Sequence, residues 1–255
     1  MPRPRTIRVT RYVTPLREGG SLPAIVEADD DGMYVLKFRG AGQGPRALIA
    51  ELVSGEIARM LELPVPEIVL AELDPELSRT EPDPEIHALI HDSAGLNLAL
   101  DYLPGAVAFD PLVHPLDGEL MARIVWLDAF VSNVDRTARN TNMLMWHRQP
   151  WLIDHGASLI FHHTPGWESQ PARARDPFTH IAKHVLRHRT RAVAAVDEAC
   201  AAALGPGAIE DLLMRIPDAW LADGDPDETR AAYARYFRER LTPPRPFLEE
   251  AARVG

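Results

Sequence analysis

The chain has 255 residues and a hydrophobic content of 46%, which excludes disorder as its main state and allows one large domain or a two-lobed unit. Its 27 basic and 37 acidic side chains leave a net charge of −10, which excludes a protein that coats nucleic acid over its whole surface. No apolar run approaches the ~20 residues that cross a bilayer, and the N-terminus lacks a signal-peptide stretch. We therefore expect a cytoplasmic protein without membrane contact.

Three strands are predicted near the N-terminus. Strand-type residues fill 7–13, 23–28 and 33–38, and a turn sequence at 30–32 joins the last two within an antiparallel meander. Lys37 stands in the otherwise apolar third strand, where burying an ammonium group without a partner is costly. It is either an edge-strand lysine that opposes aggregation or a buried lysine paired with an acid elsewhere in the chain.

The connection between the first two strands is rich in glycine. Gly19 and Gly20 let the backbone approach a ligand closely, and Ser21 adds a hydroxyl group. A plain hairpin connection is the alternative interpretation of the same residues.

A helix is predicted at 46–61 from its apolar positions at helical spacing. It carries Glu51 and Glu56, and either could face the lysine of the third strand, while the other would be a solvated surface charge. Strands at 67–73 and 96–103 complete a sheet with one helix in front, an arrangement that suits a nucleotide-binding half.

A boundary between two lobes is predicted where Pro104 and Gly105 break the last of these strands. Residues 1–103 would form an N-lobe with an antiparallel sheet, and residues 104–255 would form a C-lobe. The expected fold class is α+β.

The second half opens with a strongly apolar helix at 117–132, which should be buried on most sides. The segment 133–140 (NVDRTARN) has few apolar residues and is predicted to be an exposed loop. A short hairpin follows, with strands at 143–146 and 151–153 around a turn at Gln149 and Pro150.

The rest of the chain is predicted to be mainly helical. Residues 157–178 contain helix breakers and show no clear period, so an ordered or mobile loop is expected there. Helices are predicted at 179–189, 192–203, 207–215 and 226–241.

Three oxygen-bearing side chains lie at predicted loop positions around the hairpin. Asp135 is followed five residues later by Asn140, and Asp154 ends the apolar run of the hairpin. Carboxylate and amide oxygens are the ligands that a hard cation such as Mg²⁺ prefers.

The order of these residues is that of a protein-kinase-like phosphotransferase: a strand lysine, a helix glutamate, an Asp with an Asn five positions later, and a final Asp. The segment NVDRTARN resembles the Asn-x-Asp-Arg-x-x-x-Asn catalytic loop of the HipA-like serine/threonine kinases. The segments GGSLPAIVEA, YVLKFRGAGQGP and LIDHG fit the same family, and the likeness covers roughly residues 5 to 160.

This resemblance implies roles for the loop residues. Asp135 would orient the acceptor hydroxyl and accept its proton, Arg136 would brace the catalytic loop, and Asn140 and Asp154 would bind magnesium. Asp154, His155 and Gly156 stand where protein kinases have Asp-Phe-Gly.

The resemblance also implies a nucleotide site. Lys37 would hold the α- and β-phosphates of ATP, and Glu51, which the family spacing favours over Glu56, would pair with it. Backbone N–H groups of the glycine turn would cover the phosphates, and the backbone near the lobe boundary would contact the adenine. The residues concerned are Gly19, Gly20 and Ser21 for the phosphates, and Asp101, Tyr102 and Leu103 for the adenine.

The expected function is transfer of the ATP γ-phosphoryl group to a hydroxyl of a protein serine or threonine, with Mg²⁺ as cofactor. A small-molecule or lipid kinase and a catalytically silent nucleotide-binding module are the alternatives. The chain resembles a kinase core without the N-terminal extra domain of longer relatives, which leaves an antitoxin partner open. The sequence does not give the oligomeric state. Ser21 is a candidate autophosphorylation site by family analogy.

The basic stretch at 173–191 is a solvated face or a contact for an anionic or RNA-bound target.

Overall fold

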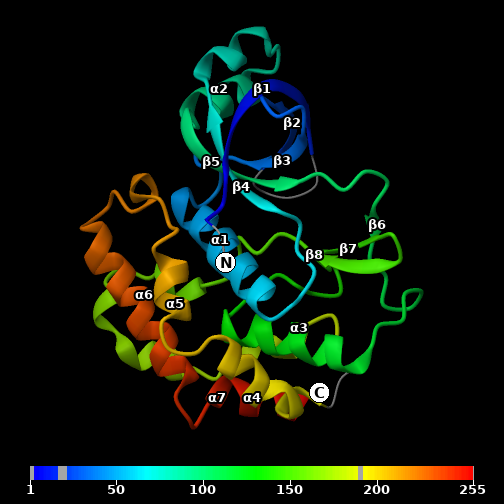
Figure 1. Cartoon of the computed structure of the whole chain (residues 1–255), viewed down its shortest axis with the longest axis vertical. Helices are drawn as coiled ribbons and strands as arrows, with labels where there is room; N and C mark the ends of the chain where they lie inside the picture. Colours follow the sequence, from blue (N-terminus) through cyan, green and yellow to red (C-terminus); the bar gives the residue numbers. More distant parts are fainter. Residues whose placement is uncertain (1–2, 17–21, 189–191, 255) are drawn as a thin grey trace.

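The computed structural model describes residues 3–16, 22–188 and 192–254. Five strands form a closed barrel in the order β1-β2-β3-β5-β4, seen at the top of Figure 1. The strands are β1 (Thr6–Pro15), β2 (Ala24–Ala28), β3 (Met33–Lys37), β4 (Ile68–Leu73) and β5 (Gly95–Asp101).

The barrel differs from the predicted all-antiparallel sheet at one strand pair. β1 and β2 pair antiparallel, as do β2 and β3, which confirms the predicted meander. β1 then pairs with β4 in parallel, and this pair closes the barrel. The sequence of the first three strands does not predict that the sheet closes into a barrel, because β4, the strand that closes it, follows helix α1 in the chain.

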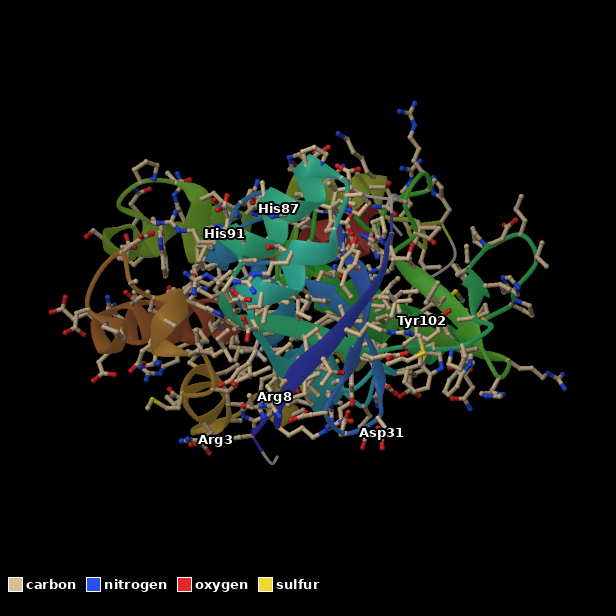
Figure 2. The ribbon with its side chains drawn as sticks, turned by 90° about the horizontal axis from the view of Figure 1, so that it is seen from above. Arg3, Arg8, Asp31, His87, His91 and Tyr102 are labelled. Carbon is tan, nitrogen blue, oxygen red and sulfur yellow. The ribbon has the colours of Figure 1, made fainter. Side chains whose placement is uncertain are left out.

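The barrel has its own apolar interior. Inward positions alternate along the strands, as in Ile7 and Val9 of β1 and in Tyr34 and Leu36 of β3, all of which are buried. The helix α2 (Pro84–Asp92) contributes apolar side chains to the same core. Figure 2 shows the outer surface of this region from above, with the exposed residues Arg3, Arg8, Asp31, His87 and His91 marked.

Helix α1 (Pro45–Met60) lies between the barrel and the helices below it (Figure 1). Its residues from Leu48 to Ala58 are buried, and it shares one apolar core with the helical part of the chain. A Cβ atom on Gly55 would lie 2.6 Å from Cδ1 of Ile68 in β4. A larger residue at this position would therefore displace the tip of the Ile68 side chain where α1 approaches the barrel.

Helices α4 and α7 pack on α3, and α5 packs on α6, all within one apolar core. The interior location of α3 confirms its predicted burial. Asp117 caps α3 by accepting hydrogen bonds from the backbone N–H groups of Glu119 and Leu120, at 2.8 and 3.1 Å. Trp126 and Phe130 on α3 stack at 5.0 Å, and both contact Phe247. The helices are α3 (Gly118–Phe130), α4 (Val193–Ala203), α5 (Ala208–Leu213), α6 (Pro226–Leu241) and α7 (Pro246–Val254).

The segment from 157 to 188 differs from its prediction. The loop expected at 157–178 is a series of short 3₁₀ turns, and the α-helix predicted at 179–189 is wrong, because a 3₁₀ turn occupies its start. The 3₁₀ turns of the chain are η1 (Pro75–Thr80), η2 (Ile160–His163), η3 (Trp167–Ser169), η4 (Pro171–Arg175), η5 (Thr179–Lys183) and η6 (Asp218–Trp220).

A second small sheet holds the predicted hairpin. It consists of β6 (Val107–Ala108), β7 (Met143–Trp146) and β8 (Gln149–Leu152) in that order. The predicted turn at Gln149 and Pro150 is wrong by two residues, because His147 and Arg148 form it with φ values of 48° and 66°. Positive φ at both central positions is the geometry that a two-residue hairpin needs, although glycine or asparagine usually supplies it.

The strands and helices confirm the predicted α+β class. The two-lobed description and the boundary between residues 103 and 104 stay predictions, and α1 shares its core with the helices that follow that boundary. No helix in the described ranges is long and apolar enough to span a membrane.

Candidate active site

Lys37 lies at the end of β3, and its ammonium group faces two carboxylates. Its Nζ atom lies 3.4 Å from Oε2 of Glu51 on α1 and forms a closer ion pair with Oδ1 of Asp154. The Lys37 side chain is 11% exposed and that of Glu51 is 1% exposed. Because β3 lies between β2 and β5, the edge-strand interpretation of Lys37 is wrong. Glu56 is buried and pairs with Arg215, so the expectation of a solvated surface charge at this position is wrong.

Burial and charge pairing act against each other at this ion pair. Burial would lower the pKa of Lys37, but the carboxylates of Glu51 and Asp154 outweigh it, and the pKa is raised. Burial would raise the pKa of Glu51, whereas Lys37 and then His155 hold it below its usual range. Both groups are therefore charged at neutral pH, so the site keeps a fixed cation where phosphate groups would be held.

The turn that carries Asp154 is strained and is anchored to α1. Asp154 has a φ of 56°, in the left-handed region that residues other than glycine seldom adopt. The next residue, His155, is fully buried, and its Nδ1 lies 3.6 Å from Oε1 of Glu51. The Asp154 side chain remains 39% exposed, so its carboxylate is accessible beside Lys37.

Asp135 is held by three asparagines. Its backbone N–H donates to Oδ1 of Asn133 at 3.0 Å. Its Oδ2 accepts hydrogen bonds from Nδ2 of Asn140 at 2.7 Å and of Asn142 at 3.1 Å. Asn142 also donates to the backbone carbonyl of Asp154 at 3.5 Å. Among the described residues no hydrogen bond reaches Oδ1 of Asp135, which leaves this oxygen available to a bound hydroxyl.

A buried polar network supports the loop from below. Asp128 on α3 accepts hydrogen bonds from Nε of Arg136 at 2.6 Å, Nε2 of His184 at 2.9 Å and Nδ2 of Asn133 at 2.9 Å. Because the backbone N–H of Leu186 donates to Nδ1 of His184 at 3.1 Å, the proton of the neutral imidazole lies on Nε2.

Arg136 connects this network to the far end of the loop. Its guanidinium is buried and also donates to the backbone carbonyl of Asn142. Burial would raise the pKa of Asp128, but Arg136 and His184 hold it well below its usual range. Arg136 therefore supports the loop from inside the protein, where no substrate reaches it.

One cavity of about 500 Å³, a size typical of small-molecule sites, is lined by five of the predicted site residues. Residues from four separate segments line it: Lys37, Glu51, Asp135, Asn140 and Asp154. The structure therefore brings these five predicted residues together around one space.

The predicted adenine contacts lie away from this cavity, at the end of β5. The backbone N–H of Asp101 donates to Glu67 at 2.9 Å, and that of Tyr102 donates to Met33 at 3.0 Å. Neither N–H group is free for a ligand, whereas within the described ranges the N–H of Leu103 has no partner. Gly19, Gly20 and Ser21 lie outside the described residues.

Three residues of the site were missed in the sequence. Asp128 had a signal, because it interrupts the apolar run of its helix, and an unpaired carboxylate is costly in such a place. Asn142 and His184 had none, since only the fold brings Asn142 to Asp135 and His184 to Asp128.

The donor set suits Mg²⁺ together with a nucleotide. Asp154 offers an accessible carboxylate, and Asn140 offers its carbonyl oxygen because its amide nitrogen is occupied by Asp135. Within the described part of the chain, no three His, Cys, Asp or Glu side chains gather as a metal site. Mg²⁺ is commonly held by one or two protein ligands and by phosphate oxygens, so this set fits it.

The barrel, the Lys37 ion pairs and the Asp135 loop define a kinase-type phosphotransferase. Among solved structures, the chain is similar to the proinflammatory kinase CtkA of Helicobacter pylori, with a TM-score of 0.58, 11% identity and 98% of both chains covered. It is also similar to the Golgi casein kinase, with a TM-score of 0.48, 10% identity and coverage of 98% of this chain and 74% of the other.

A profile of the HipA-like kinase family matches residues 9–241. The chain therefore belongs to the HipA-like kinase family, as the loop motif indicated. No curated protein gives a match.

Proposed function

We propose that this kinase transfers the γ-phosphoryl group of ATP to the hydroxyl of a serine or threonine in a protein. The single observation that carries the proposal is the convergence of Lys37, Glu51, Asp135, Asn140 and Asp154 on one cavity. This set supplies a cation for phosphates, oxygens for Mg²⁺ and a carboxylate for the acceptor.

In the proposed mechanism, Oδ1 of Asp135 accepts a hydrogen bond from the acceptor hydroxyl. The hydroxyl oxygen forms a bond to the γ-phosphorus as the bond to the β,γ-bridging oxygen breaks, and Asp135 takes the proton. Lys37, fixed by Glu51, holds the α- and β-phosphates. Asn140 and Asp154 would hold Mg²⁺, which supplies neutralisation of phosphate charge when bound.

The ion pair between Lys37 and Asp154 has to open for this arrangement to form. In the structure the Asp154 carboxylate contacts the lysine directly. Phosphate groups would then bind Lys37, and the Asp154 carboxylate would be free to hold Mg²⁺. The adenine would use the N–H of Leu103, because those of Asp101 and Tyr102 are occupied.

Lysine labelling tests the nucleotide site sharply, because the chain has only two lysines, Lys37 and Lys183. Lys183 is exposed on η5 and does not line the cavity, so it is a matched internal control. We expect an acyl-phosphate derivative of ATP to acylate Lys37 selectively and free ATP to prevent this, as measured by peptide mass spectrometry. Equal labelling of both lysines would contradict the assignment.

Replacement of Lys37 should weaken nucleotide binding. MgATP at ~100 times its dissociation constant should add about 2.7 kcal/mol to the free energy of unfolding of the wild type. We expect Lys37→Ala to lose most of this gain in a thermal melt and Lys183→Ala to retain it. If MgATP stabilises the protein but no acceptor compound leads to consumption of ATP, the alternative of a catalytically silent nucleotide-binding module is favoured instead.

A further inference from the structure

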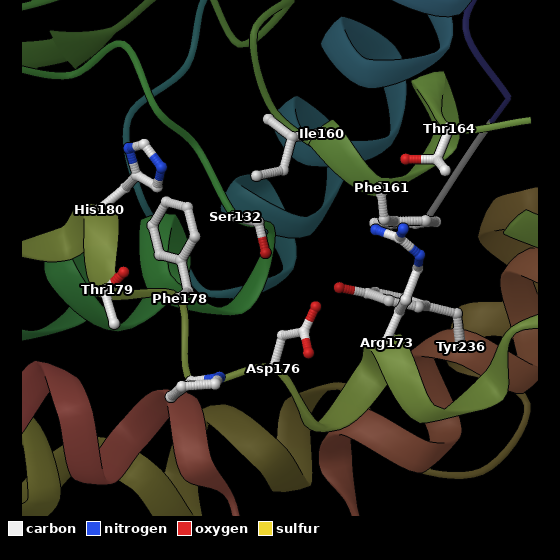
Figure 3. A pocket seen from close by; sticks show the side chains of 11 residues that line it. Ser132, Ile160, Phe161, Thr164, Arg173, Asp176, Phe178, Thr179, His180 and Tyr236 are labelled. Atoms are coloured by element: carbon white, nitrogen blue, oxygen red, sulfur yellow. The ribbon is translucent and has the colours of Figure 1, made fainter.

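A second cavity, of about 430 Å³, adjoins the active site. Ile160 lines both cavities, and Ser132, just before the Asp135 loop, lines the second. In Figure 3 the ring of Phe178 lies on one side, and the rings of Phe161 and Tyr236 lie on the other. The cavity therefore has aromatic walls among polar side chains, and it shares Ile160 with the cavity that Asp135 lines.

The walls of this cavity are held in place without a ligand. Phe161 and Tyr236 stack with ring centroids 3.6 Å apart. Arg240, which is buried on α6, donates to the backbone carbonyls of Ala174 and Asp176, both at 3.0 Å. Arg175 donates to Glu239 of the same helix at 2.6 Å. These contacts fix the 3₁₀ segment against α6, so the cavity is preformed.

The cavity also carries one cation and one anion that do not pair with each other. Nε of Arg173 donates to Oε1 of Gln170 at 2.6 Å, and no ion pair of Arg173 occurs among the described residues. The exposed carboxylate of Asp176 has no hydrogen-bond or ion-pair partner in the same ranges. Both line the cavity, and Figure 3 shows the Asp176 carboxylate directed into it.

This combination matches a stretch of polypeptide. A guanidinium donates hydrogen bonds to carbonyl oxygens and a carboxylate accepts them from N–H groups, and a peptide main chain presents both. The three aromatic rings suit an apolar side chain better than a sugar, whose surface is covered by hydroxyls. The phosphates of ATP have their own cation, Lys37, in the neighbouring cavity.

We propose that this cavity is the acceptor subsite for a protein substrate. A large apolar side chain close to the phosphorylated serine or threonine enters between Phe178 and Tyr236, while Arg173 and Asp176 bind the main chain on either side of it. The inference rests on the proposed function, since it supplies the substrate class for the Asp135 site.

A library of serine and threonine peptides, degenerate at the flanking positions, tests this subsite. The wild type should select a large apolar residue at one fixed position near the acceptor. Thr164→Phe places a ring in the cavity, and Glu168→Phe places the same ring on the exposed surface of the same segment. We expect Thr164→Phe to lower kcat/KM about ten- to hundredfold, the range for one apolar group in a pocket, and Glu168→Phe to leave it unchanged.

A second pair of variants tests the role of a charged side chain of this cavity without placing a larger side chain in it. Asp176→Ala should raise KM for the selected peptides with little change in kcat, whereas Asp211→Ala, an exposed acid on α5 outside the cavity, should change neither. All four variants should keep ATP-protected labelling of Lys37, which verifies that they fold and bind nucleotide.

The outcomes separate the two proposals. No apolar selection, equal behaviour of Thr164→Phe and Glu168→Phe, or transfer to small hydroxyl compounds but not to peptides would overturn the acceptor subsite. Failure of the wild type to label at Lys37 or to consume ATP with any acceptor would instead refute the phosphotransferase assignment itself.

Discussion

Replacing Asp135 by alanine should remove phosphoryl transfer and leave nucleotide binding intact. The proposed proton acceptor contributes about 10²- to 10⁴-fold to the rate in comparable reactions, so kcat should fall by that factor. MgATP should still raise the melting temperature, because Lys37 and Asp154 remain. The measurement is transfer of labelled phosphate to the peptide library, with ATP binding followed in parallel.

The isosteric Asp135→Asn variant sharpens this test. It retains an oxygen that can accept hydrogen bonds from Asn140 and Asn142, but it no longer offers a carboxylate to the acceptor hydroxyl. We expect it to be as inactive as the alanine variant. Full transfer by either variant would remove the role assigned to Asp135. Asp154→Asn should differ from both, because it should also lose the magnesium-dependent part of ATP binding.

Replacing Arg136 by alanine should cause the largest loss of stability. The Arg136 guanidinium and the Asp128 carboxylate are both 0% exposed at their side chains. Removing one partner of a buried ion pair leaves an uncompensated charge, which typically costs about 3 to 5 kcal/mol. The free energy of unfolding from denaturant titration measures this loss. Arg79→Ala, which breaks an exposed ion pair with Glu76, should cost at most about 1 kcal/mol.

Acid should reduce the difference between the wild type and Arg136→Ala. The folded-state pKa of Asp128 is depressed, so its contribution to stability is complete above the unfolded pKa of about 3.9 and is lost as the pH falls toward the folded value. The difference in unfolding free energy between the wild type and Arg136→Ala should therefore be constant between pH 5 and pH 7 and become smaller below about pH 4. A gap independent of pH down to denaturation would show that Arg136 acts only by packing.

The parts of the fold that the sequence could predict are those with local signals. The apolar period of 46–61, the cap at Asp117 and the alternation in the first strands depend on neighbouring residues alone. The closure of the barrel by β1 and β4 depends on partners far along the chain, and so does the docking of the 3₁₀ segment, which Arg240 holds through Ala174 and Asp176. No local pattern encodes those pairings.

The candidate site divides in a similar way. Lys37, Glu51, Asp135, Asn140 and Asp154 could be selected because their types and order match a known chemistry, and they line one cavity. The supporting residues could not be selected, because nothing but the fold places His184 beside Asp128 or aims Asn142 at two carbonyl groups. The order of residues in the sequence therefore predicts the residues that would take part in the reaction, but it does not predict the residues that hold them in position.

The side chain of Arg240 joins segments that lie far apart in the chain, and from this we expect an order of events during synthesis. Its guanidinium donates to the carbonyls of Ala129 and Phe130, at the end of the helix that leads into the Asp135 loop, and to those of Ala174 and Asp176. A nascent chain on the ribosome that has emerged only as far as α5 already contains every residue assigned to catalysis. It lacks the group that joins these segments, so phosphoryl transfer should begin only when α6 has left the exit tunnel and docked.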